Sequence, residues 1–311
     1  MAARLCIHVP DDASLLRIVD DDADLILGRE ADCDIVVAHE SVSRRHARLR
    51  GNGQAWSLLD LGSKNGTRVH GERIVESRLQ GNDWFAMGDV FCELQPIDDA
   101  QRERLEARAL ERRHASAVWS TRLDATPDET QLIGTLMKGI VELAECQRGF
   151  FLMPDAAGQL RVRACYGLSP DELAATTFCG SDSAVARAIA DRRPVFLSDR
   201  RDRAWLTDRA SVVAQGIQAL VCLPLEQDGE LLGVAYADTA DVAKEFTQLD
   251  AQLLTAFGDH AAATLAVSKL GSTLATMSSW FAVSDTGVAQ TRSAAPAWKD
   301  VARRPTIGVP P

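Results

Sequence analysis

Closely spaced turn residues divide residues 4–96 into short runs, and this pattern limits the fold more than any other feature of the chain. In the run His46-Ala-Arg-Leu-Arg50, apolar side chains alternate with charged ones, as expected for a half-buried strand. Glycine-containing turns separate such runs, for example at Asn65-Gly66 and Gly88-Asp89. Many short strands at this spacing predict an all-β sandwich, which we assign to residues 1–97.

The composition changes after this region. Residues 98–122 contain neither Gly nor Pro and are rich in Arg, Glu and Ala, which predicts a charged helical linker. We expect a solvated connector here. A dimerising helix is the alternative, but the segment lacks a convincing heptad pattern.

Residues 123–270 mix helical and strand patterns. Thr126-Pro127-Asp128-Glu129 is typical of a helix start, with Thr126 as the N-cap. Strand-like runs follow, and two of them are joined across a turn at Asp228-Gly229. Thr247 and Asp250 are expected to cap a final helix.

Residues 271–311 are rich in Ser, Thr, Ala and Pro without a sustained period, which predicts a disordered tail. The tail has four basic and two acidic residues, whereas the whole chain has a formal charge of −10.

Charge and cysteine usage narrow the function classes. An acidic chain is a poor partner for nucleic acid or anionic lipid, and no apolar stretch reaches the roughly 20 residues that span a bilayer. The N-terminus lacks the apolar core of a signal peptide. Seven cysteines without a C-x-x-C pair argue against a disulfide framework and a zinc site. We therefore expect a cytoplasmic protein with no nucleic-acid partner, no membrane association and no metal.

Three polar segments of the β region are placed where strands end and loops begin: Gly28-Arg29, Ser43-Arg44-Arg45-His46 and Asp60-Leu-Gly-Ser-Lys-Asn-Gly-Thr67. Polar loop tips on a rigid sandwich are typical of a recognition module. Together, in this order, the segments resemble the forkhead-associated (FHA) domain, whose members bind phosphothreonine peptides.

The resemblance implies a role for each matching residue. Arg29 would pair with phosphate oxygens, Ser43 would donate a hydroxyl hydrogen bond, and Arg44 would add a second positive contact. Asn65 would bind the peptide backbone, and Lys64, where the family often has Thr, would aid phosphate binding or point to solvent. Gly28, His46 and Gly66 would support the binding loops, and His46 has a structural role in this scheme rather than a catalytic one.

One position departs from the family. His70-Gly71 stands where the family commonly has Asn-Gly, and that Asn organises the recognition loop. We expect an effect of His70 on peptide selectivity more than on phosphate binding.

The 123–270 unit resembles a GAF domain, which implies an α+β domain with a central antiparallel sheet flanked by helices and often a small-molecule pocket. The resemblance rests on segments such as Leu160–Gly167 and Ala219–Ala237. The signature of cyclic-nucleotide-binding members is absent, so the resemblance names no ligand and no certain cofactor. Cys165 and Cys222 are interpreted as small core residues. Cys179 is the better candidate for a reactive thiol, although a structural role is favoured there too. Trp205 would cover or fill a pocket, and His260 would be packed or solvated rather than a haem ligand.

No P-loop, kinase signature, nucleophile elbow or H-E-x-x-H motif occurs in the sequence. We therefore interpret the chain as a multidomain, non-enzymatic bacterial signalling adaptor. Its FHA-like domain would bind a threonine-phosphorylated protein, either a Ser/Thr kinase or its substrate, and its GAF-like domain would sense a small molecule or mediate dimerisation. The alternatives are a protein scaffold with a ligand-free GAF domain and an enzyme of undetected type.

The tail contains a further candidate. Arg303-Arg304-Pro305-Thr306 resembles a substrate of a basophilic Ser/Thr kinase. Phosphorylated Thr306 would then be a ligand for Arg29 and Ser43 of the same chain or of a second copy. An incidental Thr in a disordered tail is the alternative.

Overall fold

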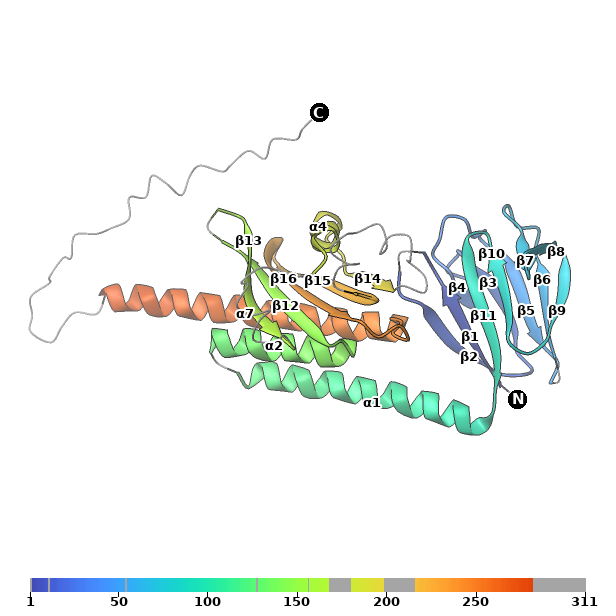
Figure 1. Ribbon diagram of the computed structural model, residues 1–311, viewed down its shortest axis with the longest axis horizontal. Helices are drawn as coiled ribbons and strands as arrows, with labels where there is room; N and C mark the ends of the chain where they lie inside the picture. Colours follow the sequence, from blue (N-terminus) through green and yellow to red (C-terminus); the bar gives the residue numbers. More distant parts are fainter. Residues whose placement is uncertain are drawn as a thin grey trace, which may run out of the picture. The chain divides into compact units, whose positions relative to one another are not determined.

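The computed structural model describes residues 2–281 apart from Asp11, Gln54, Pro127, Ala156, 168–179 and 199–215. Two sheets form the N-terminal domain and a third sheet, with its helices, forms the C-terminal one (Figure 1). The predicted fold class, a sandwich followed by an α+β domain, is confirmed. Within the described residues no helix is long and apolar enough to cross a membrane.

The N-terminal domain is a sandwich of a six-stranded and a five-stranded sheet. The first sheet has the order β2-β1-β11-β10-β7-β8, and the second has the order β4-β3-β5-β6-β9. The strands are β1 (Ala2–His8), β2 (Leu15–Val19), β3 (Asp24–Gly28), β4 (Ile35–Val36), β5 (Ala47–Gly51), β6 (Trp56–Asp60), β7 (Thr67–Val69), β8 (Glu72–Ile74), β9 (Glu76–Leu79), β10 (Asp83–Met87) and β11 (Val90–Ile97).

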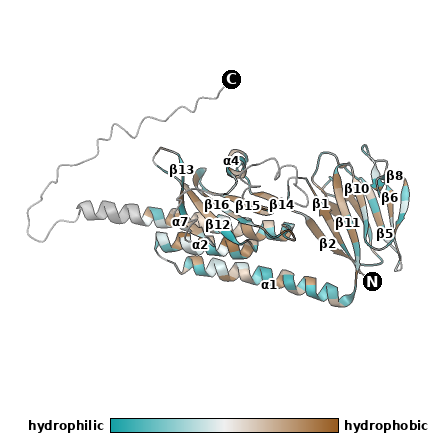
Figure 2. Cartoon of the chain, in the orientation of Figure 1, coloured by the Kyte–Doolittle hydropathy of each residue, from teal (hydrophilic) through white to brown (hydrophobic). Residues whose placement is uncertain are grey.

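The core of the sandwich follows from the alternation in its strands. Ala47 and Leu49 of β5 are fully buried, as their alternation with charged residues predicts. They pack in one cluster with inward-facing residues of the other sheet, among them Leu5 and Ile7 of β1. Figure 2 shows this pattern as brown strands in both sheets.

Helix α1 (Asp99–Asp124) follows β11 and begins at the N-cap Asp98, which forms a capping box with Gln101. The predicted helix is therefore present, but the prediction of a solvated connector is wrong for its last turns. Trp119 is buried in the core of the C-terminal domain, as is Leu123 just beyond the predicted linker. The first half of α1 is rich in charged residues (Figure 2). The composition of the whole helix therefore predicts solvation, although two apolar residues near its end are packed.

The C-terminal domain contains one antiparallel sheet of order β13-β12-β16-β15-β14. Its elements are α2 (Glu129–Ala144), β12 (Arg148–Pro154), β13 (Leu160–Tyr166), α4 (Asp182–Asp191), β14 (Val195–Ser198), β15 (Ala219–Gln227), β16 (Glu230–Thr239) and α7 (Gln248–Phe281). Asp228 and Gly229 both have positive φ in the turn between β15 and β16, as the predicted hairpin requires.

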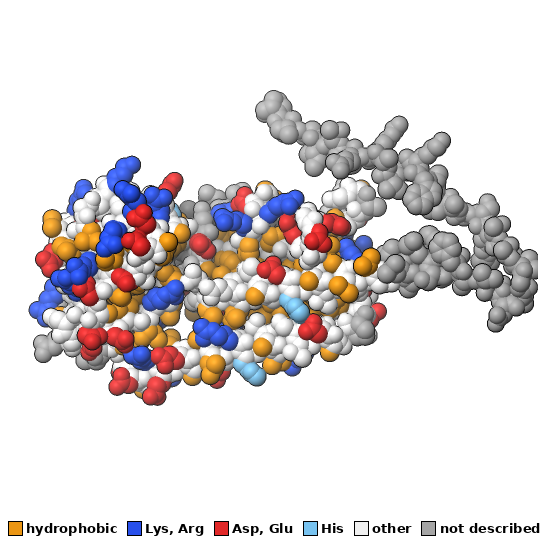
Figure 3. Space-filling model, turned by 180° about the vertical axis from the view of Figure 1, so that it is seen from behind, with side chains coloured by type: hydrophobic (Ala, Val, Ile, Leu, Met, Phe, Trp, Pro, Cys, Tyr) orange, Lys and Arg blue, Asp and Glu red, His pale blue; other side chains and the backbone are white. Residues whose placement is uncertain are grey.

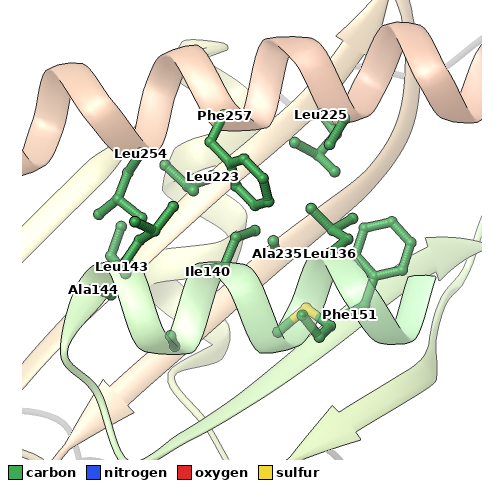
Figure 4. Close-up of a cluster of buried hydrophobic side chains, with 14 of the residues drawn as sticks. Leu136, Ile140, Leu143, Ala144, Phe151, Leu223, Leu225, Ala235, Leu254 and Phe257 are labelled. Carbon is green, nitrogen blue, oxygen red and sulfur yellow. The ribbon is translucent and has the colours of Figure 1, made fainter. Parts of the chain in front are cut away.

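The two faces of this sheet carry separate apolar clusters. On one face the side chains of α2 and α7 pack against β12, β15 and β16, and Phe257 of α7 points toward Ile140 of α2 (Figure 4). On the other face α4 covers a cluster that includes Phe150 and Tyr236, whose ring centroids are 6.1 Å apart. A buried ion pair between Arg148 and Asp238 (2.5 Å) joins β12 to β16.

Two helix boundaries differ from the prediction. The N-cap of α2 is Asp128, which accepts from the backbone N–H of Gln131 (2.9 Å), and not Thr126. The hydroxyl of Thr126 instead donates to the carbonyl of Arg122 at the end of α1 (2.8 Å). Helix α7 begins with the predicted Thr247–Asp250 cap but continues to Phe281, past the predicted tail boundary at residue 270. Leu274, Ala275 and Met277 favour helix and no Pro interrupts this stretch.

Candidate functional site

The three polar segments converge because of the strand order in the five-stranded sheet. Strand β5 runs antiparallel to β3 and to β6. The last residues of β3, the first residues of β5 and the last residues of β6 therefore lie at the same end of the sheet. Gly28 is the last residue of β3, His46 precedes β5, and Asp60 is the last residue of β6. The loops that follow or precede these residues therefore meet.

A cleft of about 640 Å³ lies between these loops. The five residues assigned to phosphopeptide binding, Arg29, Ser43, Arg44, Lys64 and Asn65, all line it. The other lining residues are Glu30, Glu40, Ser41, Val42, Arg45 and Gly62. Four basic side chains and two acidic ones thus surround the cleft, so its local charge is opposite in sign to that of the whole chain. Figure 3 shows one face of the molecule, on which many Lys and Arg side chains lie over the sandwich.

The cationic side chains at the cleft are available to an anion. Arg29, Arg44 and Lys64 are exposed, and among the residues that the structure describes no side-chain hydrogen bond or ion pair engages their charged groups. Arg45 differs because its guanidinium lies 3.3 Å from the carboxylate of Asp32. An oxyanion in the cleft would therefore meet three cations whose charge no carboxylate of the described chain neutralises.

The hydroxyl of Ser43 and the amide of Asn65 have defined orientations. The Oγ of Ser43 accepts the backbone N–H of Lys64 (3.0 Å), which leaves its own proton to donate to a ligand. The Nδ2 of Asn65 donates to the carbonyl of Ser41 (2.8 Å), which leaves the side-chain oxygen to accept from a peptide N–H. Both groups are held in place before a ligand arrives.

His46 connects two of the loops from inside the sandwich. Its Nδ1 accepts the backbone N–H of Ser43 (3.0 Å), so Nε2 carries the proton and faces the carbonyl of Gly66 (3.3 Å). The side chain is fully buried, and burial lowers its pKa below the usual 6.5. His46 is therefore a neutral imidazole that fixes the Ser43 loop against the Gly66 loop.

Gly28 has no room for a side chain. A Cβ at this position would lie 2.1 Å from the carbonyl oxygen of Arg44 and 2.8 Å from the Sγ of Cys33. The backbone of Arg29 follows directly and donates to the carbonyl of Ser43 (3.0 Å). Close backbone approach at Gly28 thus brings Arg29 and Ser43 to the same end of the cleft.

Asp60 organises the loop that carries Lys64 and Asn65, and the sequence analysis gave it no role of its own. Its Oδ1 accepts from the hydroxyls of Ser63 (2.6 Å) and Thr67 (2.7 Å). Its Oδ2 accepts from the backbone N–H groups of Gly62 (3.1 Å) and Ser63 (3.0 Å). The signal was present in the sequence, because an Asp followed by Gly and Ser is typical of a side-chain-stabilised turn.

Ser41 is a second residue that sequence reasoning missed. Its buried Oγ accepts the backbone N–H of Asp89 (2.9 Å), and its carbonyl accepts from Asn65. It therefore links the cleft to the turn between β10 and β11. No motif in the sequence indicates this contact, because the partners are 48 positions apart.

Three further candidates have defined positions outside the cleft. His70 adopts a left-handed backbone conformation (φ 51°) in the turn between β7 and β8, and its Nε2 lies 3.3 Å from Asp83. Cys222 is fully buried, and burial raises the pKa of its thiol well above the usual value. His260 pairs with Asp124 (2.8 Å). Cys179, Trp205 and Thr306 lie outside the described residues.

Comparison with known proteins identifies two domain families in the chain. The sequence model of the FHA domain family matches residues 25–88, and that of the GAF domain family matches residues 126–266. The chain therefore contains an FHA domain followed by a GAF domain, and both are regulatory modules that are typically non-catalytic. No curated protein matches the sequence.

Several solved FHA structures are similar to the N-terminal domain. The FHA domain of CT664 from Chlamydia trachomatis is 30% identical; the match covers 32% of this chain and all of that one, with a TM-score of 0.30. The FhaA FHA domain, solved in complex with the intracellular domain of Rv3910, is 27% identical over 29% of this chain and 99% of that one, with a TM-score of 0.27. EmbR from Mycobacterium tuberculosis, solved with a low-affinity phosphopeptide, is 29% identical over 30% of this chain and 24% of that one, with a TM-score of 0.26.

Proposed function

We propose that this chain is a non-enzymatic signalling adaptor whose FHA domain binds proteins phosphorylated on threonine. The observation that carries the proposal is the cleft between three loops, where Arg29, Arg44 and Lys64 present unneutralised charge beside the oriented groups of Ser43 and Asn65. A phosphate with about two negative charges and three acceptor oxygens matches this set of donors. The partner would be a Ser/Thr kinase or one of its substrates.

Each side chain has a distinct task in this proposal. Arg29 forms paired hydrogen bonds with two phosphate oxygens, because a guanidinium presents two parallel N–H groups. Ser43 donates its hydroxyl proton to the phosphate, and Arg44 and Lys64 contribute charge at the rim. Asn65 accepts from and donates to the peptide backbone beside the phosphothreonine, which distinguishes a peptide from free phosphate.

The test is a titration of fluorescent phosphothreonine peptides with the full-length protein, read by anisotropy. We expect micromolar binding that disappears when the same peptides lack phosphate. Arg29→Ala should weaken binding about 10- to 150-fold, because one charge-assisted pair contributes about 1.5–3 kcal/mol.

Arg78→Ala is the matched control. It removes the same charge from the same sandwich, but Arg78 lies on β9 and does not line the cleft. The proposal fails if no peptide of a diverse set binds, if unphosphorylated peptides bind equally well, or if Arg78→Ala and Arg29→Ala have the same effect.

We propose for the GAF domain either sensing of a small molecule or dimerisation, and a ligand-free scaffold is the second candidate. The scaffold is favoured by one observation: the described part of the α4 face is filled by packed apolar side chains, Phe150 and Tyr236 among them. Light scattering of the full chain measures the oligomeric state, and thermal shifts with a metabolite set detect a ligand. A turnover assay with nucleotides tests the enzyme alternative.

The tail supplies a further proposed ligand for the FHA domain. A phosphopeptide with the sequence of residues 300–311 would compete with other phosphothreonine peptides if Thr306 is an internal ligand. The same peptide without phosphate is the control. Weaker binding than that of unrelated phosphopeptides would count against regulation by the tail.

A further inference from the structure

A thiol, an imidazole and a carboxylate meet at β1, and none of the three residues lines the phosphopeptide cleft. Cys6 and His8 are two positions apart on β1, so their side chains leave the same face of the strand. Leu5 and Ile7 point the other way and are fully buried in the sandwich core. Cys6 and His8 therefore lie on the outer face of the six-stranded sheet.

Glu245, the third member, comes from the segment that leads into α7. Backbone hydrogen bonds hold this segment beside the residue that precedes β2: Ser14 donates to the carbonyl of Phe246 (2.9 Å), and Gln248 donates to the carbonyl of Ser14 (2.7 Å). These two hydrogen bonds place the carboxylate of Glu245 next to the hydroxyl of Ser14, although the two residues are 231 positions apart in the sequence. The cluster is thus formed by the fold and not by a local motif.

The polar atoms of the cluster are close enough to share one ion. Sγ of Cys6, a ring nitrogen of His8 and a carboxylate oxygen of Glu245 all lie within 4.8 Å of one another. The His8 Nδ1 to Glu245 Oε1 distance is 2.7 Å, and the Oγ of Ser14 lies 3.2 Å from that nitrogen and 2.8 Å from that oxygen. Cys6 is 6% exposed, and the side chains of His8 and Glu245 are 13% and 20% exposed.

We propose that Cys6, His8 and Glu245 bind a single Zn²⁺ ion. Cysteine sulfur, histidine nitrogen and carboxylate oxygen are the three protein donors that zinc uses, at about 2.0–2.3 Å. In a tetrahedron these bond lengths separate neighbouring donors by about 3.3–3.7 Å, so the observed group needs only small side-chain shifts. The fourth position would be taken by water or by the hydroxyl of Ser14.

An aromatic neighbour orients the imidazole of His8. The ring of Trp84 stacks on that of His8, with centroids 5.8 Å apart and an interplanar angle of 13°. The imidazole is therefore held in position by a neighbour that does not compete for the metal.

Zinc at this position would connect β1 of the FHA domain with the segment that begins the last helix of the GAF domain. The ion would stabilise the junction that Ser14 already forms through its backbone, because a metal that binds only the folded chain adds its binding free energy to stability. This inference does not depend on phosphopeptide binding.

The experiment uses full-length protein freed of metal with a chelator. Zinc is titrated in competition with a chromophoric chelator, and cobalt is titrated as a spectroscopic substitute. We expect one equivalent of zinc and, with cobalt, a thiolate-to-metal charge-transfer band. Cys6→Ser should abolish the band, and Glu245→Gln should weaken zinc binding at least tenfold. Zinc should also raise the Tm of the wild type more than that of Glu245→Gln.

Two variants serve as matched controls. Cys165→Ser removes a half-buried thiol on β13, and Glu93→Gln removes a carboxylate opposite Cys6 in the β1–β11 register. Both should bind zinc as the wild type does. The inference is wrong if the wild type binds less than one equivalent, or if Cys6→Ser, His8→Gln and Glu245→Gln all bind zinc with wild-type affinity.

Discussion

Removing the Asp60 side chain should destabilise the FHA domain and weaken its binding site at the same time. The carboxylate accepts from three donors in the loop that follows β6 and from the hydroxyl of Thr67, the first residue of β7. Two of these donors, the hydroxyls of Ser63 and Thr67, belong to residues that are 7% and 0% exposed. Water cannot readily replace the carboxylate there, whereas it can at the exposed Gly62.

The structure gives a magnitude for this loss. A buried donor left without an acceptor costs about 1–3 kcal/mol, so Asp60→Ala should lower the free energy of unfolding by about 2–6 kcal/mol. Asp60→Asn keeps the shape and one acceptor, and should cost about half as much. Asp22→Ala removes an exposed carboxylate of the same domain and should stay within about 0.5 kcal/mol of wild type.

Urea denaturation of the full chain, followed by pulsed hydrogen exchange and mass spectrometry, separates peptides of the sandwich from those of the GAF domain. Peptide affinity measured without urea reports whether the loop that carries Lys64 and Asn65 has moved. Equal stability of Asp60→Ala and Asp22→Ala would refute the reasoning, because it would mean that these four hydrogen bonds contribute nothing net.

Three other changes have defined outcomes. Gly28→Ala should reduce phosphopeptide affinity and stability together, because its Cβ would collide with the carbonyl of Arg44; titration calorimetry and thermal unfolding measure the two. Arg148→Ala should cost about 3–5 kcal/mol in urea unfolding of the GAF domain, because it leaves the buried Asp238 without its guanidinium. Burial raises the pKa of Glu145, but Lys244, Arg112 and Arg108 outweigh it and lower that pKa to about 2. Since this folded value lies below the ordinary 4.5, the stabilisation is present above pH 4.5 and is lost as the pH falls toward 2. Glu145→Gln should flatten this acid limb of the stability profile, and an unchanged profile would count against the ion pairs.

The sandwich and the position of its binding loops were predictable because their signals are local. Alternation at Ala47 and Leu49 requires one buried face, and glycine at residue 28 or 66 marks a backbone that a side chain would disturb. Once β5 pairs with β3 and β6, the antiparallel order alone brings the loops of Arg29, Ser43 and Asn65 to the same end of the sheet.

The features that sequence reasoning missed depend on partners far away in the chain. Trp119 sits in a segment whose composition is that of a solvated helix, and only packing against α2 explains its burial. Ser41 and Glu245 acquire their contacts from residues 48 and 231 positions away. The start of α2 was misplaced for a local reason: Thr126 and Asp128 are both good N-caps, and the Thr126 hydroxyl is already engaged by the preceding helix.

The protonation state of His46 has a consequence for how the proposed reader would respond to acid. The imidazole accepts a hydrogen bond from the backbone of Ser43, so a second proton would break that bond, and burial lowers the pKa of His46 and favours the neutral ring. A phosphothreonine, in contrast, takes up a proton near pH 6. As the pH falls from neutral, the shape of the cleft would therefore change less than the charge of its ligand. The first weakening of the complex would originate in the phosphorylated partner and not in the protein that reads it.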